Sequence, residues 1–361
     1  MLVKLLGIVG GICFALCGVP AAIGTYRAKN SIGTPISIAL AITIGAISMY
    51  LYLLLTYGFD LLLALNYSIE VVSWGLIVYY HFFPTKAVIL TVPSKLGKVY
   101  NYKRDSLDLR DEFYGEEDNQ SVLHAELDSL PSQADLRPLC SPVFDQGQVG
   151  SCTGNAAAGA FEFLQLKELR ELSVGAEEFD PKKYEPASRL FIYYNERRMD
   201  NDTQEDAGAT LRDAVKSLLY YGACPESMWP YVESKAFTKP TDAAYEDALS
   251  HRISKYYRFA DFEHIKHSLS AGYPVIFGIT LFESFESAEV AQTGLVPMPK
   301  VGRESVLGGH AVMIVGYDDT KQHVIVRNSW GTGWGDKGYF YLPYAYVQNP
   351  ELASDFWTLR K

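Results

Sequence analysis

The sequence predicts two folded parts of different class: an all-α domain of three apolar helices, followed by a larger α+β domain. Three observations carry this prediction. Residues 1–85 contain few charged side chains, residues 86–130 are rich in them, and residues 131–361 change from helical spacing of apolar residues to short β-branched runs. We therefore expect a membrane domain at 1–85, a linker at 86–130 and a folded domain at 131–361.

Three apolar segments in the first domain predict transmembrane helices. Residues 5–26 and 30–59 contain no charged side chain, and residues 61–83 contain only Glu70. Each is longer than the ~20 residues that an α-helix needs to cross a bilayer. The first segment has a second interpretation, a signal peptide whose basic start is Lys4. The two further segments favour a multi-pass, three-helix domain in the lipid bilayer.

The basic residues predict the orientation of that domain. Arg27 and Lys29 lie in the first loop, and Lys86, Lys95 and Lys98 follow the third helix. Because cytoplasmic loops carry an excess of Lys and Arg, we expect the C-terminal domain on the cytoplasmic side.

The third segment carries a polar face. Asn66, Glu70, Ser73 and Trp74 recur at helical spacing and therefore share one side of the helix. An ionisable side chain inside a membrane is costly, so this face is expected to point into a bundle or a polar cavity. Two interpretations stay open: the face lines a solute pathway, or it joins helices through hydrogen bonds.

Residues 5–83 resemble the half-SWEET (SemiSWEET) and PQ-loop family of three-helix sugar transporters. The resemblance rests on Cys17–Ala21, Lys29–Ser31 and Leu65-Asn66. It departs at Pro20-Ala21, where family members carry Pro-Gln. The resemblance implies that Asn66 contacts a solute and that the chain forms a homodimer, since such half-transporters enclose a pathway only as dimers.

The region between the two domains is predicted as a linker. Residues 105–128 are rich in Asp and Glu and lack long apolar periodicity, which is typical of a solvated segment. The alternative is a strap that folds back over the C-terminal domain.

The C-terminal domain is helical first and strand-rich later. Helical spacing of apolar residues covers the run after Cys152 and residues 187–198 and 211–221. Strands are predicted at residues 275–279, 311–317, 324–326 and 338–342. A helical lobe followed by a strand-rich lobe is typical of the α+β class.

Cys152 is the candidate nucleophile. It follows a Gly-rich turn and begins an apolar helix. Unpaired backbone N–H groups and the positive end of the helix dipole favour a thiolate there. The alternative is a small buried Cys that packs at a helix start.

Three further residues complete a candidate catalytic set. His310 follows two glycines at the start of a strand, and an imidazole shuttles protons near neutral pH. Asn328 ends a strand and can accept the imidazole N–H, while Trp330 can shield that bond from water. The amide of Gln146, with the backbone N–H of Cys152, can form an oxyanion hole.

Residues 131–361 resemble the papain family of cysteine peptidases. The resemblance rests on three motifs in the family's order, Gln146–Cys152, Gly309-His310-Ala311 and Asn328–Gly331. It implies a two-lobe fold, a helical lobe and a β-barrel lobe, and cleavage of peptide or protein substrates through an acyl-thioester and a resting thiolate–imidazolium pair. The implied roles are nucleophile for Cys152, general base and acid for His310, orienting residue for Asn328, oxyanion donor for Gln146, and substrate contacts for Gly208 and Trp330.

Three departures from the family pattern matter. Val149 replaces a disulfide-forming Cys, Thr153 replaces the aromatic residue after the nucleophile, and a long helical inhibitory pro-region is missing. The missing disulfide agrees with a reducing compartment. Cys140 and Cys224 can still pair if the domain faces outward.

Two function classes remain. The first is a membrane-anchored cysteine endopeptidase. The second is a transporter or peptide-binding membrane protein whose peptidase-like domain does not cleave. Inactive relatives usually lose the Cys, His or Gln, and all are present here, which favours the enzyme. No metal or cofactor is expected, and a net charge of −10 argues against nucleic acid as a partner.

Overall fold

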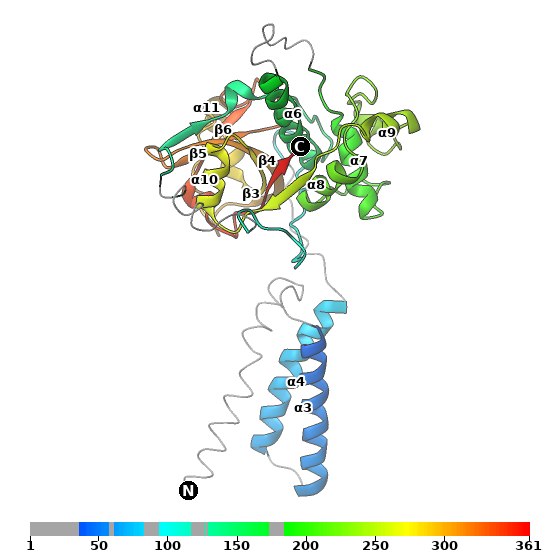
Figure 1. Ribbon diagram of the computed structural model, residues 1–361. Helices are drawn as coiled ribbons and strands as arrows, with labels where there is room; N and C mark the ends of the chain where they lie inside the picture. The colour runs from blue at the N-terminus through cyan, green and yellow to red at the C-terminus, as the bar shows by residue number, and fades with distance from the viewer. Residues whose placement is uncertain (1–35, 58–60, 83–93, 117–126, 128, 173–183) are drawn as a thin grey trace. The chain divides into compact units, whose positions relative to one another are not determined.

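The computed structural model (Figure 1) describes residues 36–57, 61–82, 94–116, 127, 129–172 and 184–361. Contacts between Cα atoms divide the chain into two units, residues 1–89 and 90–361, which are described separately. The first predicted membrane segment, residues 5–26, lies outside the described residues, as do the motifs Cys17–Ala21 and Lys29–Ser31.

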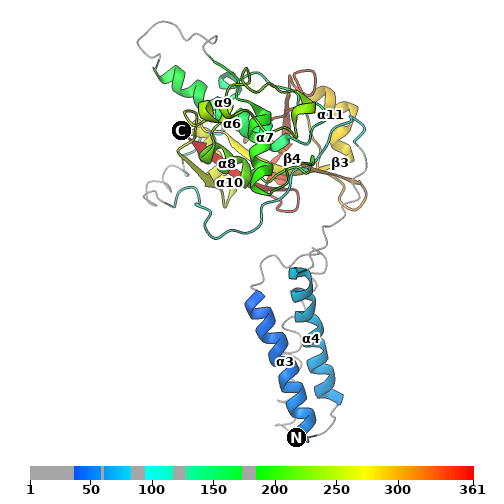
Figure 2. The ribbon, with the colours of Figure 1, turned by 90° about the vertical axis from the view of Figure 1, so that its right-hand side faces the viewer.

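The described part of the first unit is a pair of helices, α3 (Ile36–Tyr57) and α4 (Leu61–Phe82). The helices lie side by side in Figures 1 and 2. Glu70, Ser73 and Trp74, three members of the predicted polar face, are all buried. The side chain of Asn66, the fourth member, lies outside the description.

In the described part of the chain, no helix has the length and apolar character of a membrane span. The predicted three-helix transmembrane domain, its contact with lipid, its homodimer and the multi-pass localisation are therefore not supported by the structure. The prediction rested on uncharged length, and a long apolar segment also fits a helix that is buried against other protein.

The helical half of the second unit is built around α6 (Cys152–Leu172). Its residues from Cys152 to Leu164 are all buried, which explains the continuous apolar run in the sequence. The neighbouring helices are α7 (Arg189–Met199), α8 (Leu211–Tyr220) and α9 (Asp242–Ala248). The first two confirm the predicted helices at 187–198 and 211–221.

Side-chain caps begin these helices where the sequence offers a hydroxyl. Ser188, Thr210 and Thr241 each accept a hydrogen bond from a backbone N–H in the first turn of α7, α8 and α9. Such caps satisfy donors that have no partner inside the helix, so they fix where each helix starts.

The later half of the second unit is an antiparallel sheet. Its strand order is β2-β7-β3-β4-β5-β6, and β1 pairs with β4 off that path. The strands are β1 (Gln133–Asp135), β2 (Lys255–Arg258), β3 (Val275–Phe282), β4 (Val306–Asp318), β5 (His323–Arg327), β6 (Tyr339–Pro343) and β7 (Ala353–Arg360). The four predicted strands correspond to β3, β4, β5 and β6.

Short helices lie between successive strands of the sheet: α10 (Phe262–Ser270), η4 (Glu283–Glu286), α11 (Ala288–Thr293) and α12 (Tyr344–Val347). Two further 3₁₀ turns are η1 (Arg137–Leu139), between β1 and α6, and η3 (Glu233–Lys235), between α8 and α9. Helices and strands segregate into two halves of this unit, so the predicted α+β class is confirmed.

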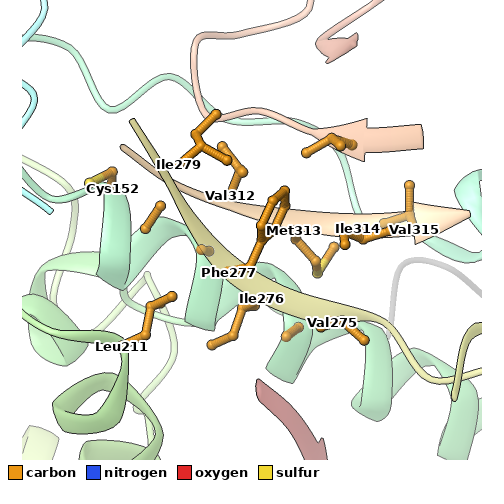
Figure 3. Packing of buried hydrophobic residues seen from close by; sticks show 14 of the residues in the cluster. Cys152, Leu211, Val275, Ile276, Phe277, Ile279, Val312, Met313, Ile314 and Val315 are labelled. Atoms are coloured by element: carbon orange, nitrogen blue, oxygen red, sulfur yellow. The ribbon is translucent and has the colours of Figure 1, made fainter. Parts of the chain in front are cut away.

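The core fixes the start of α6 against the sheet. In Figure 1, α6 lies between the sheet and the helices α7, α8 and α9. Figure 3 shows Cys152 at the first turn of α6, with Ile279 of β3 and Val312 of β4 in the same buried cluster. The two elements that carry the predicted nucleophile and base are therefore packed together.

Part of the predicted linker folds back onto the second unit. The backbone N–H of Tyr102 donates to the carbonyl of Gly309 at 3.1 Å, and that of Lys103 donates to the carbonyl of Ala209 at 2.9 Å. These two residues precede the segment 105–128 for which a strap was the alternative. Within that segment, the backbone N–H of Tyr114 donates to the carbonyl of Arg258 at 2.8 Å, which fits a strap there. We call residues 98–105 the strap.

Candidate active site

The Gly-rich turn before Cys152 joins the helical half to the sheet. Asp145 pairs with Trp330 in an antiparallel bridge, and the backbone N–H of Gln146 donates to the carbonyl of Ser329 at 2.9 Å. The turn therefore places Cys152 at the N-terminus of α6 and close to the segment that follows β5.

His310 and Asn328 form the hydrogen-bonded pair that the sequence predicts. His310 lies on β4, and its Nε2 is 2.8 Å from Oδ1 of Asn328, which follows β5. The exposed fractions are 0% for His310 and 3% for Asn328. Within the described residues, Nδ1 of His310 has no hydrogen-bond partner. When Nε2–H donates to the amide oxygen, Nδ1 is the atom left to exchange protons.

Trp330 covers this pair. Its ring centroid lies 5.0 Å from that of His310, with 27° between the two ring planes. Trp334 and Phe285 pack against the indole with edge-on geometry. An aromatic cover keeps water from the hydrogen bond between His310 and Asn328, which strengthens it electrostatically. This geometry fits the predicted shielding role.

Gln146 is held at both ends of its side-chain amide. Its Nε2 donates to the carbonyl of Val149 at 3.0 Å, and its Oε1 accepts from the hydroxyl of Ser329 at 2.6 Å. The residue is fully buried. The amide is therefore oriented by the same turn that carries Cys152.

Burial acts on the pKa values of both members of the candidate pair. Burial raises the pKa of the Cys152 thiol to about 12, although the backbone N–H groups of Ala311 and Thr153 favour the thiolate. Burial also lowers the pKa of His310 to about 4, against the hydrogen bond to Asn328, which raises it. Desolvation disfavours both charged forms. Both shifts favour the neutral forms of Cys152 and His310 while the site is covered.

The strap contributes to that burial. The ring of Tyr100 lies 6.0 Å from the ring of His310 and 5.8 Å from that of Trp330, measured between centroids. Lys98, which pairs with Asp145 at 2.5 Å, adds a positive charge that lowers the pKa of His310 further. The burial by Tyr100 and the positive charge of Lys98 thus both lower the pKa of His310.

Buried hydrogen bonds anchor the strap at three points. The hydroxyl of Tyr100 donates to Glu286 at 2.5 Å, and that of Tyr102 donates to Asp355. Asp105 accepts from the indole N–H of Trp357 at 2.8 Å. Charge-assisted bonds of this kind are about twice as strong as neutral ones, so the strap is fixed and not merely adjacent to the site.

Gly208 lies where the strap backbone passes. Its φ is +69°, and a Cβ there would lie 1.8 Å from the carbonyl oxygen of Asn101. Only glycine allows this approach. The strap backbone therefore occupies the place where the papain resemblance puts the substrate backbone.

Sequence reasoning missed several residues of this region. Asp206 holds the Gly-rich turn, because its Oδ2 accepts from the N–H of Gly150 at 2.8 Å. Tyr100, Tyr102 and Asp355 were also missed. The signal for the tyrosines was their spacing of two in an extended segment, which places both on one face.

The described cysteines are unpaired. Cys140, Cys152 and Cys224 are all free thiols, so the Cys140–Cys224 disulfide that the sequence left open is not formed. In the described ranges, no three His, Cys, Asp or Glu side chains are arranged to bind a metal ion.

A buried Cys at the N-terminus of a helix, packed against the strand of a His that an Asn orients, is typical of thiol hydrolases. Comparison with known proteins identifies the family. The sequence profile of the papain family cysteine proteases matches residues 198–356. The chain is 44% identical over 227 residues to an uncharacterized peptidase C1-like protein of Acanthamoeba polyphaga mimivirus, which is 60% of this chain and 69% of the viral protein.

Two further similar proteins are cysteine proteases. Cysteine proteinase 2 of Entamoeba histolytica is 26% identical over 62% of this chain and 66% of its own length. Xylellain, a cysteine protease from Xylella fastidiosa, has a similar solved structure with 36% identity and a TM-score of 0.64, and the match covers 73% of this chain and 97% of xylellain. The chain therefore belongs to the papain family and is a cysteine peptidase.

The half-transporter resemblance of residues 5–83 has no support among these relatives. The family profile covers His310, Asn328 and Trp330 but begins after Gln146 and Cys152. Membership of the family therefore defines the class of enzyme, and the roles of individual residues are proposals.

Proposed function

We propose that this chain cleaves bonds within peptides or proteins through an acyl-thioester on Cys152. The observation that carries the proposal is the hydrogen bond between His310 and Asn328, under Trp330 and packed against the N-terminus of α6. The strap supports cleavage within a chain, because residues 94–116 continue in both directions from the covered site. A cleft that admits a continuous chain accepts internal bonds.

The first half-reaction forms the thioester. The thiolate of Cys152 attacks the peptide carbonyl carbon, and the carbonyl electron pair moves to the oxygen. The side chain of Gln146 and the backbone N–H of Cys152 donate to that oxyanion. The imidazolium of His310 gives its proton to the leaving amine as the C–N bond breaks.

The second half-reaction releases the acid. His310 takes a proton from water, and the resulting hydroxide attacks the thioester carbonyl. The C–S bond breaks, the carboxylic acid leaves, and the thiolate of Cys152 is restored beside the imidazolium of His310, which keeps the proton taken from water. Asn328 keeps the imidazole plane aligned through both steps, since its Oδ1 accepts from Nε2 whichever way the Nδ1 proton moves.

The same site is held latent by the strap. With Tyr100 against His310 and Trp330, a substrate carbonyl has no path to Cys152, and burial keeps the thiol protonated. Opening the strap admits water and substrate, and both allow the ion pair to form. We define the opened variant as Tyr100→Ala/Tyr102→Ala, which removes two of the three anchors of the strap.

Labelling by an epoxysuccinyl thiol inhibitor tests the proposed nucleophile. The opened variant is expected to gain one covalent adduct, because an accessible thiolate opens the epoxide. Adding Cys152→Ala is expected to abolish the adduct, and adding Cys140→Ala is expected to leave it unchanged. Intact-mass measurement counts the adducts. An adduct that survives Cys152→Ala would overturn the assignment, and a folded opened variant that neither labels nor cleaves would favour peptide binding without cleavage.

A further inference from the structure

Thr153, the residue after the candidate nucleophile, is hydrogen-bonded to a buried carboxyl group. Its hydroxyl donates to Oε2 of Glu196 on α7 at 2.6 Å. Cys152, Thr153 and Glu196 all have an exposed fraction of 0%. Thr153 is also one of the positions at which the sequence departs from the papain pattern. The contact is therefore a feature of this chain that the resemblance does not explain.

Close packing of α6 against α7 fixes this contact. A Cβ on Gly154 would lie 2.9 Å from the carbonyl oxygen of Arg189 and 3.0 Å from Cβ of Tyr193. The two helices therefore approach each other most closely beside Thr153. Glu196 lies three residues after Tyr193 on α7, so both side chains share the helix face that meets the first turn of α6.

The carboxyl group of Glu196 is only partly satisfied. Within the described residues, its Oε1 has no hydrogen-bond partner. The guanidinium of the neighbouring Arg197 donates instead to the backbone carbonyls of Glu205, at 2.7 Å, and Ala236. Because an isolated carboxylate inside a protein is costly, the group is more stable with a proton. The geometry therefore favours a neutral carboxyl group beside the residue that follows the nucleophile.

The charges that face Glu196 come from its own helix and from α8. Burial is the main cause that raises the pKa of Glu196, to about 8, and the negative charge of Asp213 on α8 raises it as well. The hydrogen bond from Thr153 and the positive charge of Arg197 lower it. The group is thus poised to lose its proton just above neutral pH.

The charge of Glu196 acts on the nucleophile. Burial is the main cause of the raised pKa of Cys152, and the negative charges of Glu196 and Asp206 raise it further. The backbone N–H groups of Ala311 and Thr153 lower it. Because coupling between two ionisable groups is reciprocal, each group that loses its proton makes the other harder to ionise.

We propose that Glu196 is a positioning residue for the reaction: through Thr153 it holds the first turn of α6, and its own proton controls how readily Cys152 forms the thiolate. The inference rests on the proposed role of Cys152 as the nucleophile. While Glu196 is neutral, the N-terminus of α6 stabilises the thiolate without an opposing charge. Once Glu196 is ionised, its carboxylate opposes the thiolate, so the coupling is expected only above about pH 8.

Alkylation of Cys152 by iodoacetamide in the unaltered full chain tests the proposal. Rates are measured from about pH 6 to about pH 11 from the adduct on the peptide that contains Cys152, since the thiolate is the form that reacts. Glu196→Gln keeps an acceptor for the Thr153 hydroxyl but removes the charge. The variant is expected to match the unaltered chain at about pH 6 and to react at least about fivefold faster at about pH 10, the lower end of couplings between linked sites.

Three further variants separate charge from structure. Glu205→Gln removes an exposed acid on the segment after α7 and is the matched control, expected to follow the unaltered chain at every pH. Thr153→Ser keeps the hydroxyl and is expected to do the same. Thr153→Val removes the hydrogen bond that favours the Glu196 carboxylate, so the effect is expected to begin at a higher pH.

The unaltered chain supplies a measurement that needs no variant. The slope of the logarithm of the alkylation rate against pH is expected to fall below one just above about pH 8, where Glu196 loses its proton, and then to return to one. A slope of one throughout, or a Glu196→Gln rate equal to that of the unaltered chain at about pH 10, would overturn this inference alone. Hydrolysis by the opened variant that survives Cys152→Ala would overturn the proposed function and this inference with it.

Discussion

Replacing Cys152 by Ser in the opened variant is expected to reduce peptide hydrolysis at least about 1,000-fold, the scale seen when a covalent nucleophile is removed. The substitution keeps the size of the side chain but replaces a thiol by an alcohol that His310 must deprotonate against a far higher pKa. A thiolate is already an effective nucleophile near neutral pH, and an alcohol is not. The measurement is kcat/KM on a fluorogenic peptide.

Two controls make this result specific. Thermal unfolding is expected to be nearly unchanged, since Cys152 is buried at 0% exposure and serine fits the same space. Cys140→Ser is expected to retain activity, because that thiol lies elsewhere and its contact is with the carbonyl of Leu136. Residual activity above a tenth of the parent rate in a folded Cys152→Ser protein would contradict the assignment of the nucleophile.

Opening the strap is expected to raise the activity of the full chain at pH 7 by at least about 100-fold. Truncation of a buried aromatic residue costs about 3–5 kcal/mol, and Tyr100 and Tyr102 are each 8% exposed in the covered state. If even about 3 kcal/mol of this loss weakens the closed form relative to the open one, the open fraction rises by about two orders of magnitude. The measurement is peptide hydrolysis by the opened variant against the unaltered chain.

The same comparison has a second readout in the pH dependence of alkylation by iodoacetamide. In the covered chain the pKa of Cys152 is about 12, so its alkylation is expected to accelerate only toward that pH. In the opened variant, renewed solvation of His310 favours the imidazolium, which stabilises the thiolate, so alkylation is expected to be fast already near neutral pH. Leu109→Ala, an exposed position on the same segment, is the control. Equal alkylation rates in the opened variant and the unaltered chain would contradict the proposal that the strap keeps the site inactive.

The sequence indicated the candidate catalytic residues because their chemistry is local. Cys152 follows a Gly-rich turn and Asn328 follows the end of β5, whereas His310, predicted at a strand start, lies inside β4, which begins at Val306. The structure adds how they meet: the bridge between Asp145 and Trp330 joins the turn to the sheet. Each motif was visible alone, and only the order of the three indicated that they belong together.

The contacts of the strap could not be predicted in the same way. Tyr102 and Asp355 are 253 residues apart in the chain, and the sequence around each residue does not indicate their contact. The strands β2 and β7 were missed for a related reason. Lys255–Arg258 has no alternation of apolar and polar residues, because all four side chains are half-buried at the sheet edge. At such positions tertiary contacts determine whether a strand forms, and they override the local strand propensity of the sequence.

The prediction of a membrane domain at residues 1–85 finds no support in the described residues. Uncharged length over residues 30–59 and 61–83 indicated membrane spans, but the described helices α3 and α4 are not supported as such. A long uncharged helix needs apolar surroundings, but its sequence does not show whether lipid or other protein supplies them. The buried Glu70 belongs to the same ambiguity, since a carboxylate inside a helix pair and one inside a bundle have the same sequence pattern.

Trapping the acyl-enzyme tests the central claim most directly. The opened variant is mixed with a peptide p-nitrophenyl ester, quenched in acid within the first turnover, and analysed by intact-mass and peptide mass spectrometry. A thioester on Cys152 is expected, with the mass of the peptide acyl group and with decay on return to neutral pH. Hydrolysis of the ester without any adduct, or an adduct on a residue other than Cys152, would contradict it.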